Sequence, residues 1–349
     1  MTKAPKSLFF RSIAIFLFFF FLFLLAHLLL SNQFTSSDDP YYHAKHALLI
    51  EQSGRLNLVE SWLEFNFFNY APVDPWWGFH LGLALFINFF GLFLGVKIFV
   101  SLLAALIFLV FYLILNKLKV KYSSVWTFFL FFSSAIFCYR LFLERPHLLS
   151  MIALPLAFLF LVKGKNFWLF ILSFFYALSY DLAPLIILPA LVYSATEAYV
   201  NKRINLRPLI AAASGILFGI LVHPASLNYC YVIFVQLWQT LFLKFTGIDL
   251  GIGNETQLMN FSGFVFSNFL VLLFYVAAVV LFLALKKIDK NLIISNFLFL
   301  YSGFWFLITL LVPRGVEFWL PPAFLFIALT FSNFLGTTEF NQIRHWLRD

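Results

Sequence analysis

The sequence predicts an all-α protein that crosses a membrane many times. Of its 349 residues, 63% are hydrophobic and only 11% are charged, and the mean hydropathy is +0.94. A soluble globular chain has about 45–50% apolar and about 25% charged residues. A membrane-spanning helix needs roughly 20 consecutive apolar residues, and most of the chain divides into such runs. This composition excludes a soluble enzyme and a disordered chain.

The first apolar run covers residues 13–30 and follows three basic residues. A secretory signal peptide begins in a similar way. However, the run is long for a signal peptide, and the Ser31-Asn32-Gln33 segment after it is a poor cleavage site. We therefore expect a retained membrane anchor whose N-terminus faces the cytoplasm.

The apolar segment 77–94 decides the topology of the rest. If it crossed the membrane, the lysine cluster at 117–121 would lie outside, against the positive-inside rule. If it lies on the outer surface, that cluster and every later basic cluster lie inside. We favour the second arrangement, which predicts about ten transmembrane helices. They are expected near residues 13–30, 97–115, 123–140, 147–162, 166–180, 182–200, 208–223, 262–285, 291–312 and 318–335.

The charges divide unequally between the two sides of this topology. The inner side receives 16 of the 23 basic residues and 4 of the 15 acidic residues. The net charge of +8 is then an orientation signal and gives no indication of nucleic-acid binding. The inner basic loops suit anionic lipid head groups, so the lipid bilayer is an expected partner.

Residues 1–340 are expected to form a single transmembrane domain with two large outer segments. The first outer segment covers 31–95 and should contain helices that lie in the membrane interface, and the second covers 223–260. Residues 341–349 would be a short cytoplasmic tail, so both termini are expected inside.

Polar residues that could perform chemistry gather at the predicted outer ends of the helices. Ionisable residues near membrane depth are energetically costly and often mark functional sites. Their distribution predicts a reaction centre at the outer face. They are Asp38, Asp39, His43, His46, Asp74, His80, Glu144, Arg145, His147, Asp181, His223, Arg314 and Glu317.

The densest polar segment is DDPYYHAKHA, residues 38–47. Its Asp-Pro pair predicts a helix start with Asp39 as the N-cap. His43 and Ala47 would share one face of that helix. Asp39 then either only caps a surface helix or, with Asp38, acts as a base or a cation ligand. Two adjacent acids and His43 could supply part of the oxygen-rich shell that a hard divalent cation prefers.

Two arginines at outer helix ends each have two interpretations. Arg145 either forms a weak surface ion pair with Glu144 or holds a phosphate with its planar guanidinium group. Arg314 either extends to the interface as a membrane anchor or clamps a phosphate, and it is the better phosphate candidate. Glu317 follows it at the start of the last predicted span.

Asp181 and His223 also lie at outer loop positions, where a cap or an interface anchor is the simpler role. The sequence contains no P-loop and no dinucleotide-binding fingerprint, so ATP-driven chemistry is not expected.

Residues 38–56 resemble the first outer loop of the GT-C superfamily of membrane glycosyltransferases. The string Asp39-Pro40-Tyr41-Tyr42-His43 is similar to the motif of oligosaccharyltransferase catalytic subunits. Asp38-Asp39 followed by Tyr42 is similar to the Asp-Glu motif of protein mannosyltransferases and lipid A aminoarabinose transferases. Residues 72–91 look like the second half of the same loop. The resemblance covers about residues 10–335.

A closer likeness is to uncharacterised bacterial members of this superfamily. They combine an acidic, histidine-containing loop with an Arg-Pro pair at an outer helix end, matched here by Arg145-Pro146. They also have a Pro-containing loop like His223-Pro224 and a late arginine like Arg314.

The resemblance implies sugar transfer from a polyprenyl-phosphate donor to a lipid, glycan or protein acceptor. The reaction would take place on the extracytoplasmic face of the plasma (inner) membrane. Asp39, by the oligosaccharyltransferase match, or Asp38, by the mannosyltransferase match, would be the base. Alternatively these acids, with His43, would hold a divalent cation such as Mg²⁺ or Mn²⁺.

The same resemblance assigns the remaining candidate residues. Arg314 and Arg145 would neutralise the leaving phosphate. Supporting roles would fall to His43, Tyr42, Asp181, His223 and Glu317.

The chain departs from these families at two points. It has Asp-Asp where the mannosyltransferases have Asp-Glu, and it lacks the Trp-Trp-Asp acceptor motif of oligosaccharyltransferases. The second departure argues against a peptide asparagine as the acceptor.

Two other functions remain open on the sequence: a transporter or flippase, and a GT-C-like scaffold without activity. Transporters favour inverted repeats with broken helices and polar groups near the membrane midplane. Here the acids lie at helix ends, and no repeat is visible.

Overall fold

The computed structural model describes residues 6–35, 39–58, 70–241, 260–285 and 292–336, and these contain helices and no strand. The prediction of an all-helical chain is confirmed for them. The α-helices are α1 (Lys6–Leu30), α2 (Asp39–Ser53), α3 (Trp77–Phe90), α4 (Leu92–Lys117), α5 (Ser123–Phe131), α6 (Ala135–Leu141), α7 (His147–Val162), α8 (Asn166–Ser179), α9 (Ile187–Asn201), α10 (Arg207–Val222), α11 (Ser226–Leu241), α12 (Phe261–Leu285), α13 (Leu292–Leu311) and α14 (Val316–Phe334). The short 3₁₀ turns η2 (Ala183–Ile186) and η5 (Pro313–Gly315) precede α9 and α14.

Six helices of the described chain are long and apolar enough to cross a membrane. Three of the ten expected spans, now α7, α8 and α10, are helical but shorter than the usual spanning length. The membrane character of the protein is therefore supported, while ten crossings stay a prediction. The six are Ser7–Leu30, Leu92–Lys117, Ala183–Asn201, Phe261–Ala284, Leu292–Leu311 and Pro313–Phe334.

The expected span 123–140 is not one straight helix, because α5 and α6 meet at an 88° bend. Two serines at the break explain it. Ser133 donates its hydroxyl to the carbonyl oxygen of Leu130, and Ser134 caps α6 by accepting from the backbone N–H of Phe137 at 3.3 Å. Serine hydroxyls compete in this way with the helical backbone bonds and favour helix starts. The whole pair is apolar enough for one bent span.

Among the described residues of the predicted first outer segment, two stretches are helical, α2 and α3. Gly91 separates α3 from α4 with a φ of +79°, a conformation that favours glycine. At Gly95 a Cβ atom would lie only 2.6 Å from the carbonyl oxygen of Phe86, so the two helices turn back closely on each other. As a result α4 begins at Leu92, earlier than the expected 97.

The second outer segment also contains a helix, α11, where the sequence predicted only a large outer loop at 223–260. Five buried residues join α11 to the chain that precedes α3. They are Ala71, Val73, Tyr229, Val232 and Ile233. The two outer segments therefore pack on each other.

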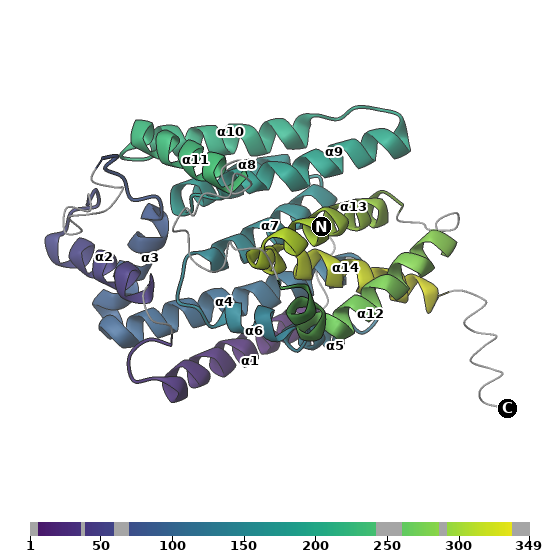
Figure 1. The fold of residues 1–349 in the computed structure, drawn as a ribbon, viewed down its shortest axis with the longest axis horizontal. Helices are drawn as coiled ribbons and strands as arrows, with labels where there is room; N and C mark the ends of the chain where they lie inside the picture. Colours follow the sequence, from purple (N-terminus) through teal and green to yellow (C-terminus); the bar gives the residue numbers. More distant parts are fainter. Residues whose placement is uncertain (1–5, 36–38, 59–69, 242–259, 286–291, 337–349) are drawn as a thin grey trace.

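The larger core runs through the bundle from Ile15 in α1 to Leu329 in α14. Large apolar side chains also remain exposed along α1 and α12, Phe21 and Phe266 among them, as expected for helices that face lipid. Figure 1 shows α2, α3 and α11 at one end of the bundle, with the α9–α10 connection and the end of α14 at the other.

Candidate functional site

Three histidines and an aspartate form a buried cluster between α2 and α3. The Nδ1 atom of His43 lies 2.8 Å from Nε2 of His80, and Nδ1 of His80 lies 2.7 Å from Oδ2 of Asp74. The same carboxylate oxygen is 3.2 Å from Nε2 of His46. All four side chains are buried.

The local sequence explains why these side chains meet. His43 and His46 lie three positions apart and so share the buried face of α2. Asp74 precedes α3 and accepts from the backbone N–H of Trp76 at 3.0 Å through Oδ1, a side-chain turn typical of aspartate. His80 follows one turn later on α3, and His223 donates from Nε2 to the carbonyl oxygen of Asp74 at 3.0 Å.

The cluster holds its negative charge on the aspartate. Burial would raise the pKa of Asp74, but His80 and His46 outweigh burial and keep that pKa well below its usual range. Burial, and then the neighbouring His80, keep the pKa of His43 well below the usual histidine value. His43 is therefore neutral at pH 7.

Asp39 forms an ion pair with Arg145, with 2.9 Å between Oδ2 and Nε. The structure thus brings the predicted catalytic acid together with a predicted phosphate-binding arginine. The Asp39 side chain is 51% exposed and the Arg145 side chain 23% exposed, so both can be reached from outside the protein. Helix α2 begins at Asp39, as the Asp-Pro pair predicted.

Glu144 contacts Thr35 and His27 and does not form the expected ion pair with its neighbour Arg145. Its Oε1 atom accepts from the backbone N–H and the hydroxyl of Thr35, at 2.8 and 2.6 Å. The same atom lies 3.5 Å from Nδ1 of His27. Burial would raise the pKa of Glu144, but these contacts lower it below its ordinary value.

Arg314 and Glu317 contact each other, and a third residue, Arg140, joins them. Glu317 accepts from Nε of Arg314 at 3.2 Å and from Nη2 of Arg140 at 2.8 Å. The Nη2 atom of Arg314 also donates to the hydroxyl of Tyr180. Glu317 and Arg140 are buried, whereas the Arg314 side chain is 32% exposed.

Sequence reasoning missed Arg140 because it lay at the end of an apparently continuous apolar span. The break between α5 and α6 moves it toward Glu317. A basic residue at the end of an apolar run was itself a usable signal, because such residues are costly in a membrane.

Asp181 lies in the turn after α8 and is buried. The side chains of Trp76 and Gln236 lie within interaction range of its carboxylate, so this turn lies near the chain before α3 and near α11. Burial raises the pKa of Asp181 above its ordinary value, although the positive charge of Arg314 opposes that change. Tyr42 lies beside the histidine cluster, with its ring centroid 5.8 Å from that of Trp76.

The Asp39–Arg145 ion pair and the group formed by Glu317 with its two arginines lie in the same region of the molecule. His147, at the start of α7, is within electrostatic range of Arg140, Arg145 and Arg314. His43 is likewise within range of Arg145, which places the histidine cluster next to the Asp39 ion pair.

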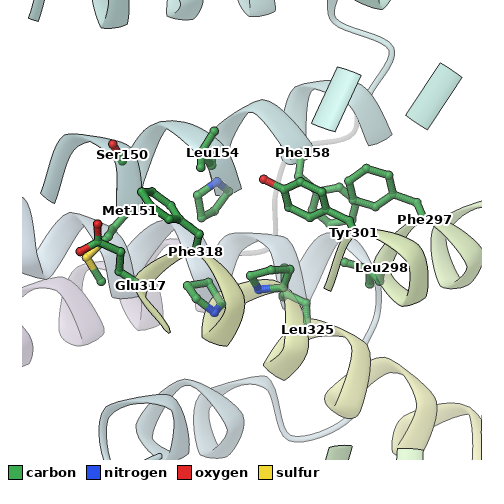
Figure 2. A pocket seen from close by; sticks show the side chains of 13 residues that line it. Ser150, Met151, Leu154, Phe158, Phe297, Leu298, Tyr301, Glu317, Phe318 and Leu325 are labelled. Atoms are coloured by element: carbon green, nitrogen blue, oxygen red, sulfur yellow. The ribbon is translucent and has the colours of Figure 1, made fainter. Parts of the chain in front are cut away.

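An apolar cavity adjoins this region between α7, α13 and α14. It is a small, partly open hollow with mostly apolar walls, and Glu317 contributes to its wall. Figure 2 shows Leu154 and Phe158 on one side, with Tyr301 and Phe318 close by.

The predicted cation ligands are only partly described, since Asp38 lies outside the described residues. Asp39 and His43 have different partners, Arg145 and His80. Within the described chain, His46, Asp74 and His80 form a group with metal-ligand spacing. The sequence placed all three in the first outer segment, but their grouping depends on how α2 packs on α3.

The chain matches no protein-family model and no curated protein sequence. A functional conclusion therefore depends on its own residues and their geometry.

Proposed function

We propose that the chain is an integral membrane glycosyltransferase. It transfers a sugar from a polyprenyl-phosphate donor to a lipid, glycan or protein acceptor at the extracytoplasmic face of the plasma (inner) membrane. Both termini lie in the cytoplasm.

The observation that carries this proposal is the ion pair between Asp39 and Arg145, with Arg314 in the same region. The exposed Asp39 carboxylate can accept a proton from an acceptor hydroxyl. Arg145 and Arg314 are partly exposed and can bind the oxygens of a phosphate. The buried Glu317 keeps Arg314 in place.

In the proposed reaction, the acceptor oxygen attacks the anomeric carbon of the sugar. The bond between that carbon and the phosphate oxygen breaks, and the lipid phosphate leaves with the bonding electrons. Asp39 takes the proton of the acceptor hydroxyl. Arg145 and Arg314 stabilise the negative charge that develops on the leaving phosphate.

The apolar cavity supports a lipid-linked donor. Its wall consists mainly of apolar side chains, and Glu317 brings a charged group to it. The hollow is too small to enclose a polyprenyl chain, but a chain that lay against these apolar side chains would have its phosphate near the arginines that contact Glu317.

The residues around Asp39 fit a divalent cation poorly. The Arg145 guanidinium already contacts the Asp39 carboxylate at 2.9 Å, and its positive charge opposes a second cation. The proposed reaction therefore uses Asp39 as a base and needs no metal at this position.

Sugar transfer in reconstituted vesicles tests the proposal. The vesicles contain a panel of radiolabelled polyprenyl-phosphate sugars with lipid acceptors. Asp39→Asn should lower transfer by at least about 100-fold, because general-base catalysis contributes about 10²–10⁴-fold. Arg314→Gln should also lower it. The matched control is Glu51→Gln, which changes an exposed carboxylate on the same helix. Wild-type turnover by Asp39→Asn would refute the assignment of the base.

One observation favours a second candidate function, a transporter or flippase. The α5–α6 pair bends by 88°, and broken helices are common in transporters. Vesicles that move a fluorescent lipid-linked sugar between leaflets, without transferring the sugar, would support this function instead.

A further inference from the structure

The buried cluster between α2 and α3 has the chemistry of a metal site that is separate from Asp39. His46 and His80 offer imidazole nitrogens, and Asp74 offers a carboxylate oxygen. The three atoms lie within 4.8 Å of one another. Imidazole ligands favour zinc and similar transition metals over magnesium.

The groups around two of these residues, His80 and Asp74, match the surroundings of known metal ligands. A histidine that binds a metal usually donates its other ring N–H to a fixed partner, and a ligating carboxylate is hydrogen-bonded in turn. Here Nε2 of His80 faces Nδ1 of His43 at 2.8 Å. The second oxygen of Asp74 accepts from the backbone N–H of Trp76.

The spacing requires only a small adjustment around an ion. Ligand atoms 2.0–2.1 Å from a tetrahedral metal lie about 3.3 Å apart. Asp74 and His46 are already at 3.2 Å, and Asp74 and His80 must separate slightly from 2.7 Å. The two histidine nitrogens lie no more than 4.8 Å apart.

The burial of these three side chains favours a bound cation. His46 and His80 have 0% exposed surface and Asp74 has 5%, so water does not solvate these side chains. Buried charges are normally paired or coordinate a metal. A cation between the three residues would balance the aspartate and would join α2 to the chain that leads into α3.

We propose that His46, Asp74 and His80 bind one divalent transition-metal ion, with zinc as the best match. The ion fixes the two halves of the first outer segment to each other. It is a structural ion, because its ligands are buried and Asp39 is not among them.

The test uses the full chain, purified in detergent with an affinity tag that contains no histidine. Elemental analysis gives the zinc content of the protein as purified. Titration with Co²⁺ after treatment with a chelator gives the stoichiometry and, from the visible absorption, the coordination. The variants are His46→Ala, Asp74→Asn and His43→Gln. His27→Gln is the matched control, because His27 is another fully buried histidine outside the group.

We expect one ion per wild-type chain and a loss of affinity of at least about 100-fold in His46→Ala and Asp74→Asn. His43→Gln should lose about 10–100-fold, as outer-shell partners of metal ligands do. The control should bind as the wild type does. Added zinc should raise the unfolding temperature of the wild type and of the control, but not that of His46→Ala or Asp74→Asn. The reason is that a ligand that binds only the folded state stabilises it.

Two results would overturn the proposal. Wild-type protein that binds neither Zn²⁺ nor Co²⁺ would leave the cluster as a hydrogen-bonded chain from Asp74 through His80 to His43. A folded His46→Ala variant with wild-type affinity would place any ion elsewhere. Gel filtration in detergent distinguishes a folded variant from a misfolded one, and the wild-type titration decides the question even if every variant misfolds. Sugar transfer is not measured, so this result is independent of the proposed enzyme activity.

Discussion

Glu317 is held by two arginines from different parts of the chain. Arg314 precedes it in the same segment, and Arg140 comes from α6. Because Glu317 and Arg140 are buried, removing one partner leaves an uncompensated charge, which costs about 3–5 kcal/mol. The exposed Asp39–Arg145 pair is different, since surface pairs contribute about 0–1 kcal/mol.

The first prediction compares these two carboxylates. Glu317→Gln should lower the free energy of unfolding by about 3 kcal/mol or more, because Arg140 loses its charged partner. Asp39→Asn should change it by less than about 1 kcal/mol, although it lowers sugar transfer by at least about 100-fold. Unfolding in detergent, followed by tryptophan fluorescence, measures both. Equal stability of the two variants would contradict the distinction between a structural and a catalytic carboxylate.

The second prediction concerns pH and Glu144. Its pKa in the folded protein lies below the ordinary value of 4.5, so the ionised form stabilises the fold. That contribution is present above pH 4.5 and is lost as the pH falls through the folded-state pKa. Glu144→Gln should cost on the order of 1–2 kcal/mol at pH 7, through loss of charge-assisted hydrogen bonds.

Below pH 4.5, wild-type stability should fall more steeply than that of Glu144→Gln. Thermal unfolding at stepped pH values measures the two slopes. The control is Glu51→Gln, which removes an exposed carboxylate. Parallel curves for Glu144→Gln and the wild type would refute the assigned role.

At the scale of helices, α8 and α10 approach each other through small residues. A Cβ atom on Gly219 would lie 2.7 Å from Cβ of Ala177 and 2.7 Å from the carbonyl oxygen of Phe174. Gly215, one turn earlier, faces Ser173 in the same way. Such small-xxx-small pairs allow close packing of membrane helices.

The third prediction is that Gly219→Ala separates α8 from α10. The added methyl group overlaps backbone atoms that cannot move away easily, so we expect a loss of about 1–3 kcal/mol in stability. Gly303→Ala is the control, because its Cβ would meet only the Tyr275 hydroxyl oxygen at 4.0 Å. Unfolding temperatures of the two variants should differ clearly. A Gly219→Ala protein as stable as Gly303→Ala would show that this contact does not limit the packing.

The whole molecule has two chemically different ends. The outer-segment helices α2, α3 and α11 lie at one end, and the connection between α9 and α10, which carries Lys202, Arg203 and Arg207, lies at the other (Figure 1). By the positive-inside rule we expect the basic end to face the cytoplasm. The proposed site would then face outward.

The fourth prediction tests this orientation by cysteine labelling. Cys138 and Cys230 are first replaced by serine, and single cysteines are then introduced at two exposed positions, Tyr70→Cys and Asn201→Cys. In intact cells, a membrane-impermeant maleimide should label Tyr70→Cys. It should label Asn201→Cys only after permeabilisation. The reverse pattern would place the proposed site in the cytoplasm.

The sequence by itself determined the helical membrane class and where most helices lie. The predicted span 147–162 coincides with α7, and 166–180 differs from α8 by one residue. Hydropathy is a local property, so a window of residues is enough to find such segments. The sequence also predicted that polar residues gather at one set of helix ends, because the positions of polar residues between apolar runs are enough to infer this.

Only the tertiary structure decided which of these residues meet. Asp39 reaches Arg145, and Arg140 reaches Glu317, across more than a hundred intervening residues. The grouping of Asp74 with two histidines depends on the rotation of α2 against α3. A contact of this kind is set by the direction in which each helix presents its side chains and by the distance between the helix axes. Those quantities belong to the packed bundle, and no local stretch of sequence contains them.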